Sequence, residues 1–135
     1  MRKIEKIIIH CSATKSNKRY SFEQLERDHK ARGFICCGYH YYITRDGQLH
    51  FGRPEEVVGA HAKGYNARSI GICYEGGLDE QGYPADTRTP AQKAALIRLL
   101  TELKHRYPTA TIHSHRDFAP KACPCFDATT EYAYL

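Results

Sequence analysis

Near the N-terminus lies the stretch Lys6-Ile7-Ile8-Ile9-His10, in which three consecutive isoleucines are followed by a histidine. Consecutive β-branched residues are typical of a strand that is buried on both faces. We therefore expect a strand inside a sheet, with His10 at its C-terminal end, on the sheet rim. Binding and catalytic sites are often built at that rim. By itself, His10 is more simply explained as a hydrogen-bonded rim histidine.

Local patterns also predict two longer helices. A capping box, Ser21-Phe22-Glu23-Gln24, opens a helix that runs toward Ala31, and Gly33 suits its end. A second box, Thr89-Pro90-Ala91-Gln92, has proline at the first helical position and precedes regularly spaced leucines as far as Pro108. Strands are expected at residues 6–10, 39–44, 49–51, 69–74 and 110–113, with a hairpin turn at 45–48, a polar loop at 76–88 and a further helix start at 129–135.

The length of 135 residues suits one domain with a sizeable core, and we assign residues 1–135 to it. A hairpin combined with crossover helices predicts an α+β fold, in which helices flank a central mixed β-sheet. No apolar run is long enough for a membrane span. The isoleucine run is also too short for the core of a signal peptide, so we expect synthesis in the cytoplasm without general secretory export.

The six cysteines do not suggest a disulfide framework, because Cys36 and Cys37 are adjacent and the others are scattered. Without an export signal, we expect reduced thiols or a metal ligand. The net charge of +5 favours anionic partners in general, and plain solubility explains it equally well. No motif combines aromatic and basic residues as nucleic-acid binders do, so no nucleic-acid partner is expected.

Candidate metal ligands gather near the C-terminal end. Together with His10, one histidine and one cysteine from this region make three protein ligands, the number typical of catalytic zinc sites that keep water in the fourth position. Spacing alone does not choose between His113 and His115, which share a face in an extended strand, or between Cys123 and Cys125. A free cysteine also packs as a small apolar residue, so the pattern does not require a ligand role.

Two further side chains offer chemistry near these ligands. Lys121 stands two residues before Cys123, so it can point into the same site, where a lysine stabilises negative charge on a carbonyl oxygen. Its simpler explanation is a solvated loop charge. Tyr39 follows Gly38 at the start of the expected hairpin, where a tyrosine normally fills the core or the rim. Neither residue identifies a reaction by itself.

Seven short segments follow one another along the chain: Ile9-His10-Cys11-Ser12-Ala13-Thr14, Gly38-Tyr39-His40-Tyr41, Arg45-Asp46-Gly47, His61-Ala62-Lys63-Gly64-Tyr65-Asn66, Ser69-Ile70-Gly71-Ile72, Thr89-Pro90-Ala91-Gln92, and His115 to Cys123. In this order they resemble the zinc-dependent N-acetylmuramoyl-L-alanine amidases of the phage lysozyme and peptidoglycan-recognition type. The resemblance extends from Ile7 to Asp127. It implies the fold of these amidases and hydrolysis of the amide bond between N-acetylmuramic acid and L-alanine in bacterial peptidoglycan, by a phage or prophage lysin. Separately, we expect the chain to be a monomer.

The resemblance also implies a ligand set. One zinc ion per chain is expected on His10, His115 and Cys123, because the family's His-x-Asp-x-Ala-Pro motif begins at His115 and not at His113. Family members that lack the cysteine ligand bind peptidoglycan without hydrolysing it. The presence of Cys123 therefore favours an enzyme.

Catalytic and substrate-binding roles are implied in the same way. Tyr39 matches the family's catalytic tyrosine, which would orient the attacking water, and Lys121 matches the lysine that would stabilise the oxyanion. His61 and Asn66 match positions that line the substrate groove. Cys125 departs from the pattern, because similar proteins usually have a small hydroxyl residue or glycine there.

Other functions are also compatible with these residues. One is a peptidoglycan-binding module with little or no catalysis. Another is a cysteine hydrolase with Cys123 as nucleophile and His115 or His10 as base. A glycosidase is not expected, because Asp117 and Asp127 read more simply as caps than as the paired carboxylates of glycoside hydrolysis. The lack of an export signal fits a phage lysin released by a partner protein, and it also fits muropeptide recycling in the cytoplasm.

Overall fold

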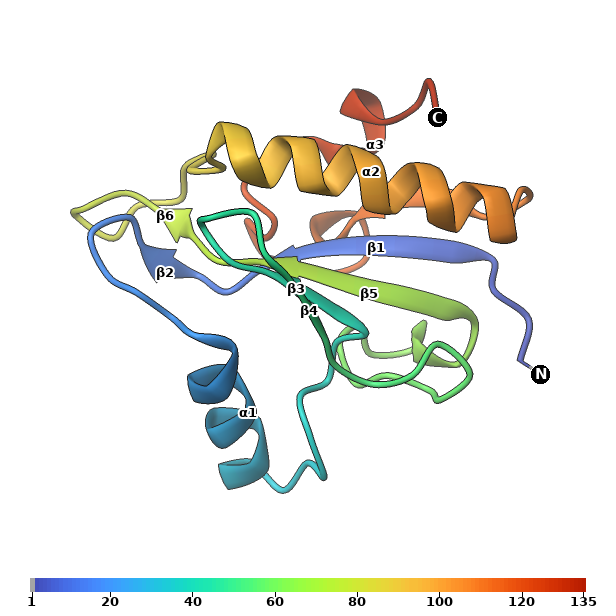
Figure 1. The fold of residues 1–135 in the computed structure, drawn as a ribbon, viewed down its shortest axis with the longest axis horizontal. Coiled ribbons are helices and arrows are strands. Elements are labelled where there is room, and N and C mark those ends of the chain that lie inside the picture. The colour runs from blue at the N-terminus through green and yellow to red at the C-terminus, as the bar shows by residue number, and fades with distance from the viewer. Residues whose placement is uncertain (1) are drawn as a thin grey trace.

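A five-stranded mixed sheet runs through the middle of the computed structural model, which describes residues 2–135 (Figure 1). The strand order is β4-β3-β5-β1-β7. Neighbouring strands from β3 to β7 run parallel, and only β4 is antiparallel to its neighbour, because a hairpin joins it to β3. The strands are β1 (Lys6–Cys11), β3 (Tyr41–Ile43), β4 (Leu49–Phe51), β5 (Ser69–Tyr74) and β7 (Thr111–Ser114).

Helices cover both faces of this sheet. The long helix α2 (Pro90–Arg106) lies along one face, and α1 (Phe22–Ala31) packs on the opposite side (Figure 1). Among the described residues, no helix combines the length and the apolar character needed to cross a membrane. The smaller elements are a two-stranded ribbon of β2 (Thr14–Lys15) and β6 (Gly77–Leu78), the 3₁₀ turns η1 (Asn66–Arg68) and η2 (His115–Asp117), and the short helix α3 (Ala128–Glu131).

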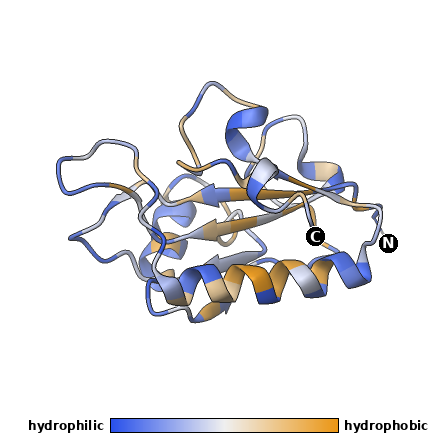
Figure 2. Ribbon diagram, turned by 90° about the horizontal axis from the view of Figure 1, so that it is seen from above, coloured by the Kyte–Doolittle hydropathy of each residue, from blue (hydrophilic) through white to orange (hydrophobic). Residues whose placement is uncertain are grey.

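The larger core lies between the sheet and α2. Side chains alternate between the two faces of a strand, so Ile7 and Ile9 of β1 face α2 together with Ile70 and Ile72 of β5. Figure 2 shows the run of hydrophobic residues that α2 carries. Complete burial of a leucine or isoleucine stabilises the fold by about 1.5–3 kcal/mol. The leucines of α2 in this core are Leu96, Leu99, Leu100 and Leu103.

The same alternation turns His10 toward the face opposite α2. On that face, a second and smaller apolar cluster includes Leu25 of α1, Tyr42 of β3 and Cys73 of β5. His10 pairs with Cys73 across the parallel β1–β5 ladder, one residue before β1 ends. Its imidazole therefore lies near the C-terminal edge of the sheet on the α1 side, as expected for a rim residue.

The predicted α+β architecture with a mixed sheet and flanking helices is confirmed, and element boundaries differ by a few residues. The Thr89 box is complete, whereas in α1 the side chain of Gln24 bonds to Asp28 (2.8 Å) instead of returning to the backbone of Ser21. The strand expected at 39–44 is shorter, because β3 covers only Tyr41–Ile43, and the last strand, expected at 110–113, is β7 at Thr111–Ser114. The loop expected at 76–88 contains the short strand β6. The C-terminal helix, expected to start at 129, begins at Ala128.

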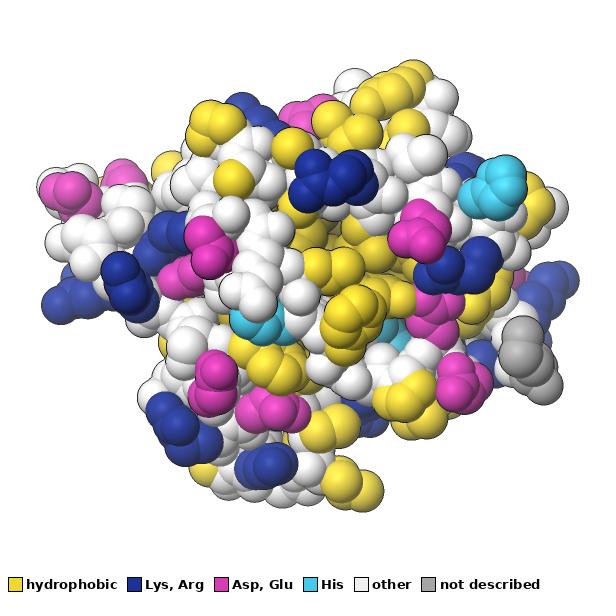
Figure 3. Space-filling model, in the orientation of Figure 1, with side chains coloured by type: hydrophobic (Ala, Val, Ile, Leu, Met, Phe, Trp, Pro, Cys, Tyr) yellow, Lys and Arg dark blue, Asp and Glu magenta, His cyan; other side chains and the backbone are white. Residues whose placement is uncertain are grey.

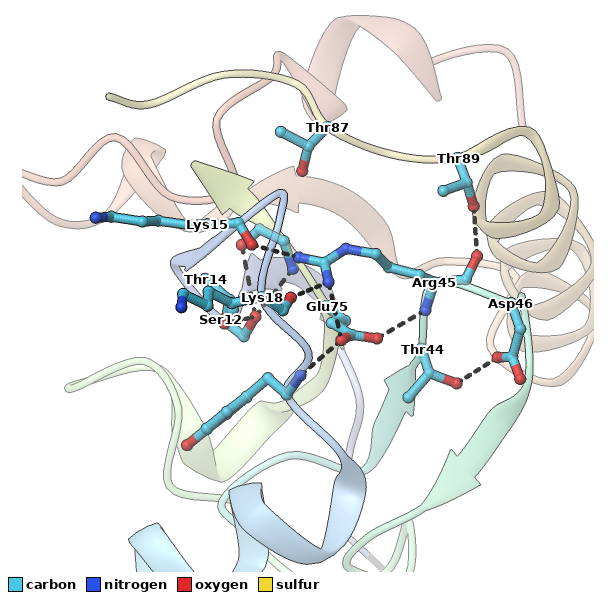
Figure 4. A network of polar contacts seen from close by, with 12 residues as sticks. Ser12, Thr14, Lys15, Lys18, Thr44, Arg45, Asp46, Glu75, Thr87 and Thr89 are labelled. Atoms are coloured by element: carbon cyan, nitrogen blue, oxygen red, sulfur yellow. Dashed lines mark hydrogen bonds and ion pairs between the residues drawn. The ribbon is translucent and has the colours of Figure 1, made fainter. Parts of the chain in front are cut away.

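A partly buried ion pair between Arg45 and Glu75 ties the segment after β1 to the rest of the molecule (Figure 4). Glu75 is 4% exposed, and its carboxylate accepts hydrogen bonds from the backbone N–H groups of Tyr20 (2.7 Å) and Arg45 (2.9 Å) and from the Arg45 guanidinium (3.2 Å). The guanidinium also donates to the carbonyl oxygens of Lys15 and Lys18. Thr89 donates to the Arg45 carbonyl (2.7 Å), so the network reaches the start of α2.

Candidate metal centre

Three side chains with metal-binding atoms converge where β1 and β7 end. Each of His10, His115 and Cys123 offers one ligand atom, and these atoms lie within 4.8 Å of one another. β1 and β7 are adjacent and parallel, so their C-terminal ends meet at one edge of the sheet. His10 comes from β1, His115 opens η2 directly after β7, and Cys123 lies on the loop that follows η2.

The two histidines present nitrogen atoms suited to a metal ion. Nδ1 of His115 is buried and has no hydrogen-bond partner among residues 2–135, which is costly for a polar atom unless a ligand completes it. Nε2 of His10 contacts Nδ1 of His61 (2.8 Å), so its own Nδ1 is the ring nitrogen left for a metal. Burial, with smaller effects from the neighbouring histidines, holds the pKa of His10 well below its ordinary value. Burial and the charge of Lys121 also lower the pKa of His115. Both rings are therefore neutral at pH 7, as metal ligands must be.

Cys123 has the environment of a thiolate. Its Sγ accepts a hydrogen bond from the backbone N–H of Cys11 (3.2 Å). Hydrogen bonding from the Cys11 side chain is the largest cause that lowers the pKa of Cys123, and the charge of Lys121 acts in the same direction. A deprotonated sulfur is the form that binds metals. The group thus contains two imidazole nitrogens and one cysteine sulfur, which are donor types that zinc binds.

The structure distinguishes His115 from His113 and Cys123 from Cys125, the two pairs in which spacing alone did not identify the candidate ligand. β7 ends at Ser114, so His113 and His115 do not share one strand face. The ring of His113 instead contacts Thr111 Oγ1 (2.6 Å) and the ring of Phe118. Cys125 adopts a positive φ of 69°, and its Sγ lies 3.8 Å from Sγ of Cys11. His115 and Cys123 are the members that join His10.

A cavity of about 470 Å³ opens beside this group, and both predicted catalytic residues line it. The Tyr39 ring is inclined at 56° to the His10 ring, with centroids 5.1 Å apart. Burial, followed by the nearby thiols of Cys73 and Cys123, raises the pKa of Tyr39 well above its ordinary value, so the phenol stays protonated and can donate a hydrogen bond. Lys121 is exposed at the cavity, where its charge faces the ligands.

The two predicted groove residues, His61 and Asn66, also line the cavity, and both make internal contacts. Asn66 Oδ1 accepts hydrogen bonds from the backbone N–H groups of His61 and Ala62, each at 2.9 Å. It therefore shapes the loop that carries His61. The His61 imidazole lies between His10 and Ser69 Oγ, to which its Nε2 is 3.2 Å distant. Burial lowers the pKa of His61 to about 3, so this ring is neutral.

Sequence reasoning missed several residues that border the cavity. His29 of α1 accepts a hydrogen bond at Nδ1 from the backbone N–H of Gly38 (2.8 Å) and so fixes the turn that precedes Tyr39. Its signal was present in the sequence, because His29 is four residues after Leu25 and shares the buried face of α1. Arg32 and Phe34 border the cavity from the loop after α1, and no sequence pattern marks them.

A larger cavity, of about 700 Å³, lies elsewhere, near the loop before α1 and the β3–β4 turn. Its charged side chains include Arg45 and Glu75, which already pair with each other in the network of Figure 4. The face of the molecule in Figure 3 shows basic and acidic side chains interspersed around an apolar area. Positive charge is thus not concentrated on that face. The side chains that could bind a metal ion, His10, His115 and Cys123, lie instead at the smaller cavity.

Known proteins are similar to this chain in sequence and in architecture. The family model described as N-acetylmuramoyl-L-alanine amidase matches residues 1–126. An endolysin from Klebsiella phage KP32 is 47% identical over 121 residues, which are 90% of this chain and 80% of the relative. The structure of N-acetylmuramoyl-L-alanine amidase LysC from Clostridium intestinale URNW matches with a TM-score of 0.83 at 33% identity, over 96% of this chain and 82% of that one. Drosophila PGRP-LB, at 23% identity and a TM-score of 0.82, shares the fold over 98% of this chain and 81% of its own.

Proposed function

The chain belongs to the N-acetylmuramoyl-L-alanine amidase family, and from this premise we propose that it hydrolyses the amide bond between N-acetylmuramic acid and L-alanine in bacterial peptidoglycan. The observation that carries the proposal is the convergence of His10, His115 and Cys123 beside an open cavity, with Nδ1 of His115 buried and unpartnered. Three ligands leave a metal ion one position for water or substrate.

Zinc is the metal that these donors favour, because it accepts imidazole nitrogen and thiolate sulfur in a tetrahedral arrangement. His10, His115 and Cys123 would hold one ion per chain. When bound, zinc supplies Lewis acidity toward the amide carbonyl and toward water. A thiolate ligand reduces that acidity, so the surrounding protein groups have to assist the reaction.

Tyr39 and Lys121 are the groups placed to assist. The protonated phenol of Tyr39 lies beside His10 and orients the attacking water by a hydrogen bond. The ammonium group of Lys121 stabilises the negative charge that develops on the carbonyl oxygen in the transition state. Preorganised donors of this kind lower the barrier by about 2.7–4 kcal/mol each. Arg32 and Phe34 extend the cavity wall, so the peptide stem of the substrate can lie along it.

The main alternative is a peptidoglycan-binding module without turnover. The complete three-ligand group supports an enzyme instead, because a module that only binds has no need of a thiolate facing two neutral histidines. Glycosidase chemistry is disfavoured by the cavity itself. Among the described residues that line it, none is Asp or Glu, and glycoside hydrolysis normally needs two carboxylates.

The proposal is tested by mass analysis of purified muropeptides after incubation with the zinc-loaded protein. We expect peptides that begin with L-alanine, new free amino groups and intact glycan strands. Treatment with a strong chelator should abolish the cleavage, and added zinc should restore it. New reducing sugar ends without new amino groups would contradict the amidase assignment, and tight binding without cleavage would favour the binding module.

The place of action is also part of the proposal. Relatives such as the endolysin of Klebsiella phage KP32 come from bacteriophages. We infer that this chain likewise acts on the bacterial cell wall after release from the cytoplasm in which it is made. We also propose that the chain acts as a monomer, since it carries by itself the three proposed ligands and both proposed catalytic side chains.

A further inference from the structure

His61 lies against the interior of the sheet, at a place where the backbone has no side chain. Gly71 is the third residue of β5, and a Cβ atom built on it would lie 2.6 Å from Cγ and Cδ2 of the His61 ring. No side chain fits at that distance. A glycine inside a strand weakens it, and such a position often marks the close approach of another group. Gly71 therefore makes room for the His61 imidazole beside β1.

Packed against Gly71, the His61 ring contacts the proposed metal ligand His10. Its Nδ1 is 2.8 Å from Nε2 of His10, and its Nε2 is 3.2 Å from Ser69 Oγ. Asn66 Oδ1 holds the loop in place by accepting the backbone N–H groups of His61 and Ala62. The His61 ring is thus held by its packing against Gly71, by the hydrogen bond of its backbone to Asn66, and by the Ser69 hydroxyl group on the side away from His10.

The contact determines which nitrogen of His10 can bind a metal. Because His61 occupies Nε2, the ligand atom of His10 has to be Nδ1. A histidine that binds metal through Nδ1 carries its hydrogen on Nε2, and a buried N–H group needs an acceptor. Nδ1 of His61 is that acceptor when His61 carries its own hydrogen on Nε2, toward Ser69 Oγ.

We propose that His61 is a positioning residue for the metal ligand His10: it accepts the Nε2–H of His10 and holds the tautomer whose Nδ1 faces His115 and Cys123. The inference rests on the proposed metal site and adds to it a role that differs from contact with substrate. Hydrogen-bond partners of ligating histidines orient the ring and raise its basicity, and their loss typically weakens metal binding 10–100-fold.

The test compares the zinc affinities of purified wild-type protein, His61→Ala and His61→Asn by competition with a chromophoric chelator. An asparagine places its side-chain oxygen near the position of histidine Nδ1, so His61→Asn keeps the acceptor. We expect zinc affinity to fall about 10–100-fold in His61→Ala and to recover most of that loss in His61→Asn. Arg68→Ala, in the turn η1 that follows the same loop and outside the lining of the cavity, should leave zinc affinity unchanged.

Two further measurements keep the test decisive. The absorption spectrum of the Co²⁺-loaded protein should change in His61→Ala and return toward the wild-type spectrum in His61→Asn, because it reports the ligand geometry. Gly71→Ala should also weaken zinc binding by displacing the ring, and it should add little in the His61→Ala background, since residues that act through one contact are not additive. Thermal unfolding of the metal-free variants identifies any that fail to fold.

The outcomes separate this inference from the proposed function. If the wild type binds zinc and cleaves muropeptides while His61→Ala keeps full zinc affinity, the positioning role is wrong and the amidase assignment stands. In that case a raised KM alone would assign His61 to the substrate groove. Equal zinc affinities of His61→Asn and His61→Ala would also refute the role. A wild type that binds no zinc would overturn both proposals.

Discussion

Cys123 and Cys125 are two residues apart, yet their thiols lie in different environments. Hydrogen bonding to Cys11 lowers the pKa of Cys123, which faces the two histidines, whereas the Cys11 side chain and burial raise the pKa of Cys125. Loss of a proton is therefore easier at Cys123, beside the two histidines, than at Cys125, whose thiol stays protonated.

This difference predicts that a serine at position 123 and a serine at position 125 have different effects on zinc content and activity. Cys123→Ser should strongly reduce both the zinc content and the muropeptide cleavage, because a hydroxyl group is a poor zinc ligand compared with a thiolate. Cys125→Ser should keep one zinc ion per chain and most of the activity. Metal analysis of both dialysed variants provides the measurement. Full zinc and full activity in Cys123→Ser would show that the ligand assignment is wrong and would make Cys125 the first suspect.

Lys121 and Tyr39 face the ligands without belonging to them, so their loss should affect the rate rather than the metal. We expect Lys121→Ala to keep its zinc and to lose about 10²–10³-fold in kcat, with a smaller change in KM, because the ammonium group acts on the transition state. Tyr39→Phe should lose less, since it keeps the packing of the ring. Steady-state kinetics on a defined muropeptide, with zinc content measured in parallel, tests both. An unchanged kcat in Lys121→Ala would contradict the catalytic role and show that Lys121 is only a solvated loop residue.

At the level of elements, the first turn of α2 also connects the helix to the ends of two strands. The side chain of Gln92 is fully buried, closes the capping box with Thr89 and donates to the carbonyl oxygens of Ile43 (3.1 Å) and Glu75 (3.0 Å). It therefore joins the ends of β3 and β5 to the helix. The side chain of the corresponding residue of α1, Gln24, bonds to Asp28 and Arg27 of its own helix.

The two glutamines form a matched pair for a stability measurement. Gln92→Ala should lower the free energy of unfolding by about 2–4 kcal/mol, because buried carbonyl groups lose their donor and a cavity remains. Gln24→Ala should cost less than about 1 kcal/mol, as expected for a partly exposed helix residue. Urea unfolding of both variants, monitored by circular dichroism, provides the comparison. Equal losses would mean that the contacts from α2 to the strand ends contribute little.

For the whole molecule, burial lowers the pKa of several histidines, which predicts that the metal-free fold loses stability in acid. His40 is 1% exposed; its Nδ1 accepts the backbone N–H of Gly71 (3.0 Å), and its Nε2 lies 2.8 Å from the carbonyl oxygen of Val57. Burial lowers the pKa of His40 from the ordinary 6.5 to about 4. The pKa in the folded state is thus below that in the unfolded state, so the unfolded chain binds the proton more readily.

The sign of this linkage predicts how stability changes with pH. The contribution of His40 is complete above pH 6.5, is lost progressively as pH falls toward 4, and then stays constant; a shift of this size corresponds to roughly 3 kcal/mol. Chemical unfolding of the chelator-treated protein at pH 7 and at pH 4.5 should show the loss. His40→Gln should be less stable at pH 7 and should depend less on pH over the same range. An identical pH dependence in that variant would contradict the prediction.

Much of the fold was readable from local patterns, because these act over a few residues. Three isoleucines before His10 predicted β1, and Thr89 with Gln92 predicted the start of α2, since strand burial and helix capping depend on neighbours in the chain. The order of seven motifs identified the family and assigned His115 as a ligand in place of His113. The assignments of Tyr39 and Lys121 also came from those motifs and remain predictions about catalysis.

Other features were decided only by the tertiary structure, because they depend on residues far apart in the chain. The separation of Cys123 from Cys125 follows from the position of Cys11, more than a hundred residues earlier, beside the loop that carries them. The contact between His61 and His10 needs a strand interior without a side chain, and Gly71 provides it only once β5 lies next to β1. No periodicity or spacing in the sequence encodes such an approach, since it arises when a loop packs onto the finished sheet.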